Sequence, residues 1–355
     1  MPVAPSRFFI RTFSALFWLL LFFLFLFSPR YVSFFQKEKS LSIFTFPLLI
    51  DAQYVSEFER RTGIKLYIHY YENNDELLTK LRSTKHHGYD IIFPSDYVVK
   101  QMIKEKLLKK LDKSRLQFLN RLNPKLMGLY FDVGNDYSMP YLWEIYGIGY
   151  LREHFGESGP PPTWDLIFNK SIASPFIGML NNAREVIAIA TLYRFGTVRK
   201  LTLAELKQVK KVLVKQKKHI EVYTDLRTDR LLLSKTCFAV AAASNNVWQM
   251  DDPRLGFLLP KEGGFITVDN VCVTETCQKT DFAYQFINYL FEYDTASHHV
   301  DEYAFLPTLT DIPFVRERGR QLMKRALKKF KTLHFFKKVA SEKQLSDLWI
   351  SLKAN

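Results

Sequence analysis

The stretch that decides the fold is YYENNDELLTKLRSTKHHGYDIIFPSDYVVKQMIKEKLLKKL, which covers residues 70–111. Its leucines at 77, 78 and 81 recur at helical spacing and predict a helix, and Gly88 supplies the stop after it. A short apolar strand is expected at 90–93, and it ends abruptly at the PSDY turn, 94–97. The order strand end, helix, strand, turn and helix is typical of an open α/β sheet.

The turn at 94–97 admits two interpretations. Ligands of open α/β sheets bind beyond the carboxyl ends of strands, so a hydroxyl, a carboxylate and a phenol placed there form a binding lip. Alternatively, Ser95 or Asp96 only caps a helix that starts at Tyr97. These residues alone favour the cap.

The chain upstream shows the same alternation. A strand is expected at 43–46, and a helix follows it between Asp51, placed as its cap, and Gly63, placed as its C-terminal stop. A second strand is expected at 64–71. Together with the stretch above, this gives β-α-β-α-β-α, which predicts a parallel sheet flanked by helices.

Further elements are expected downstream. Amphipathic helices are predicted at 203–214 and 281–293, and a buried strand at 238–243. The triple proline at 160–162 marks a surface loop, and TWDL at 163–166 is a cap with a helix start.

The composition allows a large core but gives a basic protein. Hydrophobic residues make up 47% of 355, and 50 Lys and Arg against 36 Asp and Glu give a net charge of +14. Such a charge suggests nucleic acid or an anionic membrane surface as a partner, without choosing between them.

The amino end predicts export. Arg7 and Arg11 precede FSALFWLLLFFLFLF at 13–27, an apolar run between a signal-peptide core and a short membrane span in length. No small-x-small cleavage pattern follows, so a cleaved signal and an uncleaved anchor both stay open. The first cysteine is Cys237, which excludes a lipoprotein signal at this position. Residues 1–40 are assigned to a signal peptide or membrane anchor with its linker.

Motifs for other chemistries are absent from the sequence. It has no phosphate-binding G-x-x-x-x-G-K-[ST], no H-E-x-x-H and no G-x-S-x-G. The histidine pairs at 86–87 and 298–299 are adjacent, which makes them poor joint metal ligands. Cys272 and Cys277 are close enough to pair across a turn, but buried free thiols are preferred. No enzymatic role, metal or cofactor is therefore expected.

Several motifs in a fixed order resemble one known family. They are YYENN (70–74), GYD (88–90), LDKS (111–114), DYSMPYLW (136–143), AREV (183–186) and PKEGG (260–264). Over about residues 43–307 the chain resembles the spermidine/putrescine-binding periplasmic proteins of polyamine ABC importers.

The resemblance implies a fold, a function and a location. The fold would be α/β, a type II-like periplasmic binding protein with two hinge-joined lobes: 41–143 plus 258–305, and 144–257 plus 306–355. The protein would bind putrescine or spermidine in the cleft and deliver it to an ABC transporter permease, with no nucleic-acid partner. It would lie in the periplasm, either free or tethered to the inner membrane through its N-terminal hydrophobic segment.

The resemblance also implies the ligand contacts. Ser95 and Tyr97 stand where the family has its serine and tyrosine, and Asp269 stands where an aspartate meets an amine. Glu185 keeps the family's glutamate, with Asn182 in place of an aspartate three residues earlier. For this pair the alternative is a capping box, in which Glu185 folds back onto the backbone of Asn182.

The sequence departs from the family at several aromatic positions. Phe46 remains as an aromatic wall, but two tryptophans are replaced near Ala242 and at Thr267, and a late tyrosine is Phe305. Each lost contact costs about 1 kcal/mol where desolvated, so specificity has room to change. The same fold with another small solute, or a tethered sensor without a transport role, are therefore the alternatives.

Two carboxylates offer compensation. Asp96 in the turn and Glu144 in the crossing segment stand where the family commonly has neutral residues, and they would restore negative potential for a cation. The plain alternative is that Asp96 caps the helix and Glu144 pairs with a lysine. Trp143 is expected to pack in the core.

The segment after Pro313 is strongly basic. Apolar residues at 322, 327, 330 and 333 give it one apolar side. It either lies on an anionic membrane or, as preferred here, packs on the second lobe with its basic face in solvent.

Overall fold

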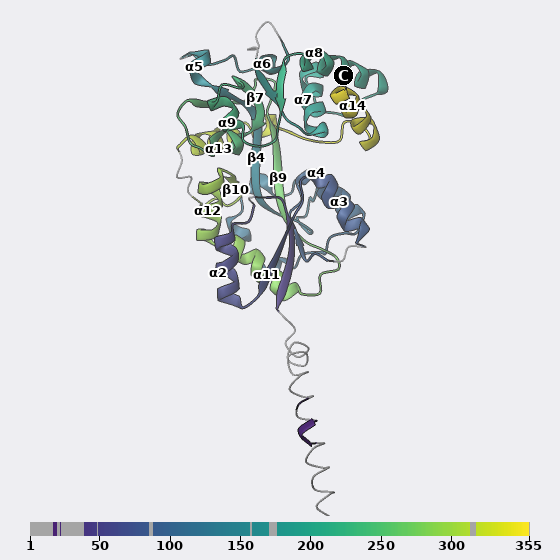
Figure 1. The fold of residues 1–355 in the computed structure, drawn as a ribbon, viewed down its shortest axis with the longest axis vertical. Coiled ribbons are helices and arrows are strands. Elements are labelled where there is room, and N and C mark those ends of the chain that lie inside the picture. Colours follow the sequence, from purple (N-terminus) through teal and green to yellow (C-terminus); the bar gives the residue numbers. More distant parts are fainter. Residues whose placement is uncertain are drawn as a thin grey trace, which may run out of the picture.

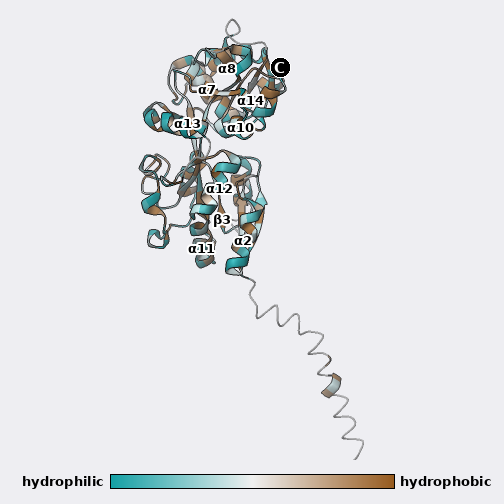
Figure 2. Ribbon diagram, turned by 90° about the vertical axis from the view of Figure 1, so that its left-hand side faces the viewer, coloured by the Kyte–Doolittle hydropathy of each residue, from teal (hydrophilic) through white to brown (hydrophobic). Residues whose placement is uncertain are grey.

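The computed structural model describes residues 39–354 except 48, 85–87, 157, 170–175 and 313–316, together with 17–19 and 22. Most of the apolar run at 13–27, the histidine pair at 86–87 and Arg316 thus lie outside the described residues. Within the described part, no helix has the length and apolar character needed to cross a membrane. Two lobes are stacked along the long axis (Figure 1) and join at a narrow waist when seen from the side (Figure 2).

The first lobe is built on parallel strands, as predicted. Sheet order runs β2-β1-β3-β9, where β9 is the strand Phe265–Val273. Strand β1 is parallel to both β2 and β3. Its elements are β1 (Ser40–Thr45), α2 (Ala52–Thr62), β2 (Lys65–Tyr70), α3 (Asn74–Ser83), β3 (Ile91–Ile92), α4 (Asp96–Lys104), α11 (Thr280–Leu290) and α12 (Tyr293–Tyr303). The predicted helix at 281–293 corresponds to α11, which ends three residues earlier, and α12 follows it as a further helix.

Local signals set most boundaries in this lobe. The side chain of Asp51 accepts from the backbone N–H of Gln53, and Gly63 ends α2 at φ 68°, both as predicted. The stop at Gly88 is wrong, because α3 already ends at Ser83. The hydroxyls of Ser83 and Thr84 both donate to the carbonyl of Lys80, and such bonds compete with the helix ladder.

Two long antiparallel strands carry the chain between the lobes. They are β4 (Met139–Leu151) and β9 (Phe265–Val273), and short β10 (Leu306–Pro307) pairs with β4. Trp143 is fully buried there, and its indole N–H donates to the carbonyl of Pro307 at 2.9 Å, which confirms core packing. β4 pairs with β10 up to Trp143, and beyond it with β7 (Ala239–Ala243) and β8 (Leu255–Leu258).

We propose the lobe boundary of β4 at this change, at 143/144. The strand β9 begins beside Tyr146 and ends beside β3. We therefore place the second crossing inside β9 and not at residue 258. We also place β10 in the first lobe, because it pairs with Leu142 and Trp143. The rest of the proposed partition is kept.

The second lobe continues the sheet in the order β4-β7-β5-β6. Its elements are α5 (Arg152–Phe155), α6 (Asp165–Phe168), β5 (Ile177–Met179), α7 (Ala183–Phe195), α8 (Leu203–Lys217), β6 (Ile220–Tyr223), α9 (Thr228–Leu233), β7 (Ala239–Ala243), α10 (Ser244–Trp248), β8 (Leu255–Leu258) and α14 (Glu342–Ala354). The helices α6, α7, α8 and α14 share one apolar core with β5 and β7. Cys237, Cys272 and Cys277 are all free and buried.

The basic tail packs on the protein. Helix α13 (Glu317–Lys328) buries Leu322 and Ala326 in the main core, and Leu327 and Phe330 pack against it. Figure 2 colours most of this helix as hydrophilic. A packed helix with a solvated basic face is thus confirmed. Its assignment to the second lobe stays a proposal, because it joins the core that also holds β1 and β3, and Lys125, from the stretch before β4, donates to the carbonyl of Leu327. A short strand, β11 (His334–Phe335), then pairs with β9.

Candidate functional site

A network of hydrogen bonds joins the starts of α3 and α4 to the middle of strand β9. The hydroxyl of Ser95 donates to Oδ1 of Asp269 at 2.7 Å, and the amide of Asn74 donates to both Ser95 Oγ (3.1 Å) and the Tyr97 hydroxyl (2.9 Å). The backbone N–H of Ser95 donates back to Oδ1 of Asn74 at 3.1 Å. The structure thus brings Ser95, Tyr97 and Asp269 together.

This network argues against the cap interpretation of the turn, while a ligand contact there stays a prediction. Ser95 is the N-cap residue of α4 but makes no side-chain capping bond, because its hydroxyl is directed to Asp269. The helix begins at Asp96 and not at Tyr97. Asn74, which the sequence analysis missed, aligns both hydroxyls; its place in the YYENN motif, in the turn from β2 to α3, was the available signal.

Asp96 lies beneath the turn and is fully buried. The Tyr130 hydroxyl donates to its Oδ2 at 2.8 Å, and the backbone N–H of Val268 donates to Oδ1 at 3.2 Å. These two hydrogen bonds act to lower the pKa of Asp96, but burial outweighs them and raises it from 3.8 to about 7. Since protein donors hold both oxygens, Asp96 ties the turn to strand β9.

Glu144 lies on the crossing strands, opposite Thr267 in the register of β4 and β9. The Tyr146 hydroxyl donates to its Oε2 at 3.1 Å, and Thr267 Oγ1 donates to the same oxygen at 3.5 Å. No lysine is paired with it among the described residues. Burial, and next the charge of Asp269, raise the pKa of Glu144 from 4.5 to about 8.

Asp269 is two residues along β9 from Thr267 and therefore on the same face of the sheet. It is 3% exposed. Burial raises the pKa of Asp269 from 3.8 to about 6, while the hydrogen bond from Ser95 acts in the opposite direction. A cation on this face of the sheet would meet two carboxyl groups, Asp269 and Glu144, and the charge of the first disfavours ionisation of the second.

The second lobe presents Asn182 and Glu185 at the start of α7. The side chain of Asn182 accepts from the backbone N–H groups of Arg184 (3.0 Å) and Glu185 (3.3 Å), so it is a cap. In a capping box the side chain of Glu185 would also accept from the backbone N–H of Asn182. That hydrogen bond is not formed in this part of the described chain. The carboxyl of Glu185 is instead buried, and burial together with the charges of Asp225 and Glu144 raises its pKa well above the usual value.

Asp225 is the second residue that the sequence analysis missed. It follows β6, whose parallel neighbour β5 leads to Asn181 and Asn182. The backbone N–H of Asn181 donates to Oδ1 of Asp225 at 2.7 Å. Carboxyl ends of parallel strands share one sheet edge, and that rule would have placed Asp225 beside Glu185.

One guanidinium accompanies these carboxylates. Arg184 lies over the ring of Tyr97, 4.8 Å from its centroid, and pairs with Glu342 at 2.7 Å. It thereby links α7 and α14 of the second lobe to α4 of the first. Glu342 also pairs with Lys338 at 3.0 Å, and the charge of Arg184 acts to lower the pKa of Glu185, so Arg184 offsets part of the repulsion among these carboxyl groups.

The ring of Tyr71 lies between Phe46 and these acidic side chains. Phe46 is half-buried and lies edge-on to Tyr71, with ring centroids 6.2 Å apart. Burial is the main reason why the pKa of Tyr71 is raised, and the charge of Asp269 is the next. Tyr71 therefore lies near the acidic groups. A direct ligand contact of Phe46 stays a prediction.

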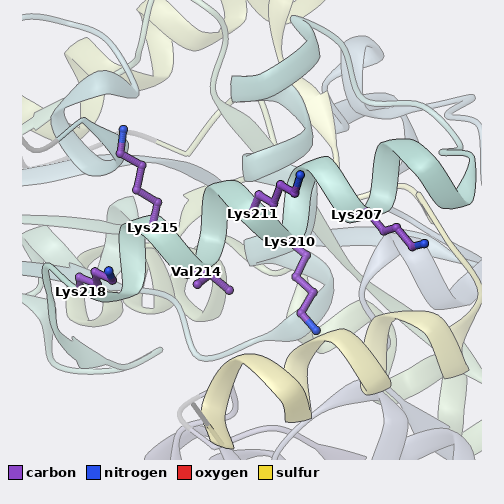
Figure 3. Close-up of a pocket in the computed structure, with 6 residues that line it drawn as sticks. All are labelled: Lys207, Lys210, Lys211, Val214, Lys215 and Lys218. Atoms are coloured by element: carbon purple, nitrogen blue, oxygen red, sulfur yellow. The ribbon is translucent and has the colours of Figure 1, made fainter.

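A hollow on the outer side of α8 has the opposite charge. Lys207, Lys210, Lys211, Lys215 and Lys218 line it together with Val214. Figure 3 shows these lysines pointing away from the helix. Such a surface repels cations, so it is not an alternative place for a cationic ligand.

The chain is similar to known solute-binding proteins. A family model described as "Bacterial extracellular solute-binding protein" matches residues 53–314. The putrescine-binding periplasmic protein of Escherichia coli is 28% identical over 286 residues, covering 75% of this chain and 76% of that protein. Spermidine/putrescine-binding periplasmic protein 1 of Haemophilus influenzae is 28% identical over 258 residues, covering 72% and 71%.

A solved structure agrees in fold. The substrate-binding protein of a spermidine/putrescine ABC transporter from Streptococcus pneumoniae superposes with a TM-score of 0.75 at 23% identity. The superposition covers 89% of this chain and 99% of that one.

Proposed function

The chain belongs to the bacterial extracellular solute-binding proteins, and on that premise we propose that it binds a polyamine such as putrescine or spermidine between its two lobes. In this proposal it passes the amine to the permease of an ABC importer. The protein works in the periplasm, and the N-terminal apolar run is its export signal or anchor. Its task is binding and delivery, so no bond of the ligand is made or broken.

The observation that carries this proposal is a group of carboxyl groups where the lobes meet, of which Glu185 and Asp269 are buried and Glu144 is half-buried. Glu144, Glu185 and Asp269 have raised pKa values because burial and their neighbours disfavour the charged form. A ligand with protonated amines removes that repulsion and forms charge-assisted hydrogen bonds in a site closed to water. A neutral or anionic solute would leave the repulsion in place.

We assign the contacts as follows. Asp269, aligned by Ser95, meets one ammonium from the first lobe, and Glu185 meets another from the second. The remaining proposed ligand-binding residues are Phe46, Asp96, Tyr97, Glu144 and Asn182. Ligand that bridges the lobes favours the closed form, which the permease then recognises.

A second candidate is the same fold binding another small cation. Thr267 and Asn182 stand where the resembling family has an aromatic and an acidic side chain, so a shorter or less charged amine would lose fewer contacts. Binding of a monoamine tighter than that of putrescine would favour this candidate.

Thermal unfolding of the full chain tests the proposal. At a hundredfold excess over its dissociation constant, a ligand adds about 2.7 kcal/mol to the free energy of unfolding. We expect putrescine or spermidine to raise the melting temperature, while sodium chloride of matched ionic strength does not. No rise with either amine at millimolar concentration would contradict amine binding.

Glu144 and Asp96 should respond differently to neutralisation. Glu144→Gln is expected to weaken amine binding by roughly tenfold, because a desolvated charge near the ligand is lost. Asp96→Asn should have a smaller effect, since protein donors already hold both oxygens of Asp96. Calorimetric titration of each variant checks this, and unchanged affinity in both would remove these two residues from the site.

A further inference from the structure

A lysine of the C-terminal helix sits in a ready-made ammonium site. The Nζ atom of Lys353 lies 3.5 Å from the ring centroid of Tyr223 and 4.6 Å from that of Trp349. The two rings stand at 89° to each other with centroids 5.6 Å apart. Nζ also donates to Oδ1 of Asn181 at 3.0 Å. Two aromatic faces and an acceptor oxygen are what recognises an ammonium.

This cage adjoins the proposed polyamine site. The backbone N–H of Asn181 donates to Asp225, and the next residue, Asn182, caps the helix that carries Glu185. The charge of Asp225 has two effects: it attracts the ammonium of Lys353, and it raises the pKa of Glu185. The charge of Asp225 therefore acts both on an ammonium in the cage and on the carboxyl group of Glu185.

The position of Lys353 is fixed by its neighbours. The ammonium of Lys217 donates to the carbonyls of Leu352 (2.7 Å) and Lys353 (3.1 Å), which pins the last turn of α14 onto α8. The Lys353 side chain itself is exposed, so its replacement leaves the core of the second lobe intact.

We propose that Asn181, Tyr223, Asp225 and Trp349 form a second ammonium site, that Lys353 occupies it, and that Lys353 thereby restricts the length of the bound polyamine. The inference rests on the proposed function. An amine tethered beside its site has an effective concentration in the millimolar range and competes with any ligand ammonium that reaches the cage. A diamine held by Asp269 and Glu185 avoids Lys353, whereas the third ammonium of a longer polyamine meets it.

The test compares putrescine with spermidine by calorimetric titration of the full chain. Lys353→Met keeps the length of the side chain and removes its charge. We expect spermidine affinity to rise by about tenfold relative to putrescine affinity, as one aromatic-caged cation contact is gained. Adding Asp225→Asn to Lys353→Met should cancel most of that gain.

Two matched variants distinguish the effect of the cage on the affinity ratio from the effect of the net charge of the protein. Lys353→Arg keeps the charge in the cage and should leave the ratio of affinities unchanged. Lys211→Met removes the same charge from the outer face of α8 and should also leave it unchanged. An equal change of the ratio in Lys211→Met would attribute the effect to long-range charge and overturn the proposal.

Chemical labelling gives an independent readout. Spermidine that enters the cage of the wild-type protein displaces Lys353, so acetylation of Lys353 by a limiting reagent should become faster with spermidine than with putrescine. If both amines bind but neither the ratio nor the labelling rate moves, the cage proposal is wrong and the proposed function stands. If no amine binds to any variant, both fail.

Discussion

Replacing Asp269 by asparagine is expected to weaken putrescine binding by about a hundredfold, which corresponds to the loss of one charge-assisted contact in a desolvated site. The carboxyl is nearly inaccessible to solvent, and Ser95 aligns it through a 2.7 Å hydrogen bond. Asparagine has the same shape and still accepts from Ser95. The variant therefore removes the charge while it leaves the first-lobe network in place.

The matched control is Asp281→Asn. Asp281 is also in the first lobe, but its side chain is 79% exposed and pairs with Arg115 at the surface. This variant should bind like the wild type, because solvent and salt screen an exposed charge. Titration calorimetry compares the three proteins at one pH. Wild-type affinity in Asp269→Asn would mean that the amine is held elsewhere.

Amine affinity is expected to rise by at least about tenfold between pH 5.5 and pH 8.5, because the carboxylates that meet the ligand must first lose their protons. The pKa values of Asp269 and Glu144 in the ligand-free protein are about 6 and about 8. Bound ammonium groups stabilise the ionised form and lower both pKa values, so binding releases protons. Affinity should therefore level off above about pH 8.

The stability of the ligand-free protein should run in the opposite direction. The pKa values of Asp269, Asp96 and Glu144 in the folded chain lie above the usual 3.8 to 4.5. Between the unfolded and the folded pKa values, the folded state binds more protons than the unfolded state. The contribution of these three protonated carboxyl groups to the free energy of unfolding is therefore complete at low pH. It is lost as the pH rises through about 6 to 8.

Melting curves with and without spermidine across this range measure both effects. The melting temperature without ligand should fall from pH 5.5 to pH 8.5, while the rise caused by the amine grows. Glu144→Gln should flatten the first trend. A ligand-induced rise that is largest at pH 5.5 would contradict the assignment of these carboxyl groups.

Local signals predicted most of the first lobe. Asp51 and Gly63 fix the ends of α2 through contacts within a few residues, and the alternation of elements fixes the parallel sheet. The stop at Gly88 was wrong because nearer hydroxyls end α3 first. The capping box at Asn182 and Glu185 was half right, since the burial of Glu185 outweighs its return to the backbone.

The rest of the site depends on contacts between distant parts of the chain. Ser95 meets Asp269 across 174 positions, and Arg184 meets Glu342 across 158. Only the register of β4 and β9 shows that Glu144 faces Thr267 and lies near Asp269. No spacing in the sequence places Lys353 against Tyr223, because the packing of α14 on the second lobe decides it.

The central claim is that buried carboxylates from both lobes hold a protonated amine, and calorimetric titration of putrescine into the full chain at pH 8 tests it most directly. The account predicts one saturable site per chain, an observed heat that varies linearly with the ionisation enthalpy of the buffer because protons are released, and loss of binding in the double variant Asp269→Asn with Glu185→Gln. No heat of binding for putrescine or spermidine at millimolar concentration, or unchanged binding in the double variant, would contradict it.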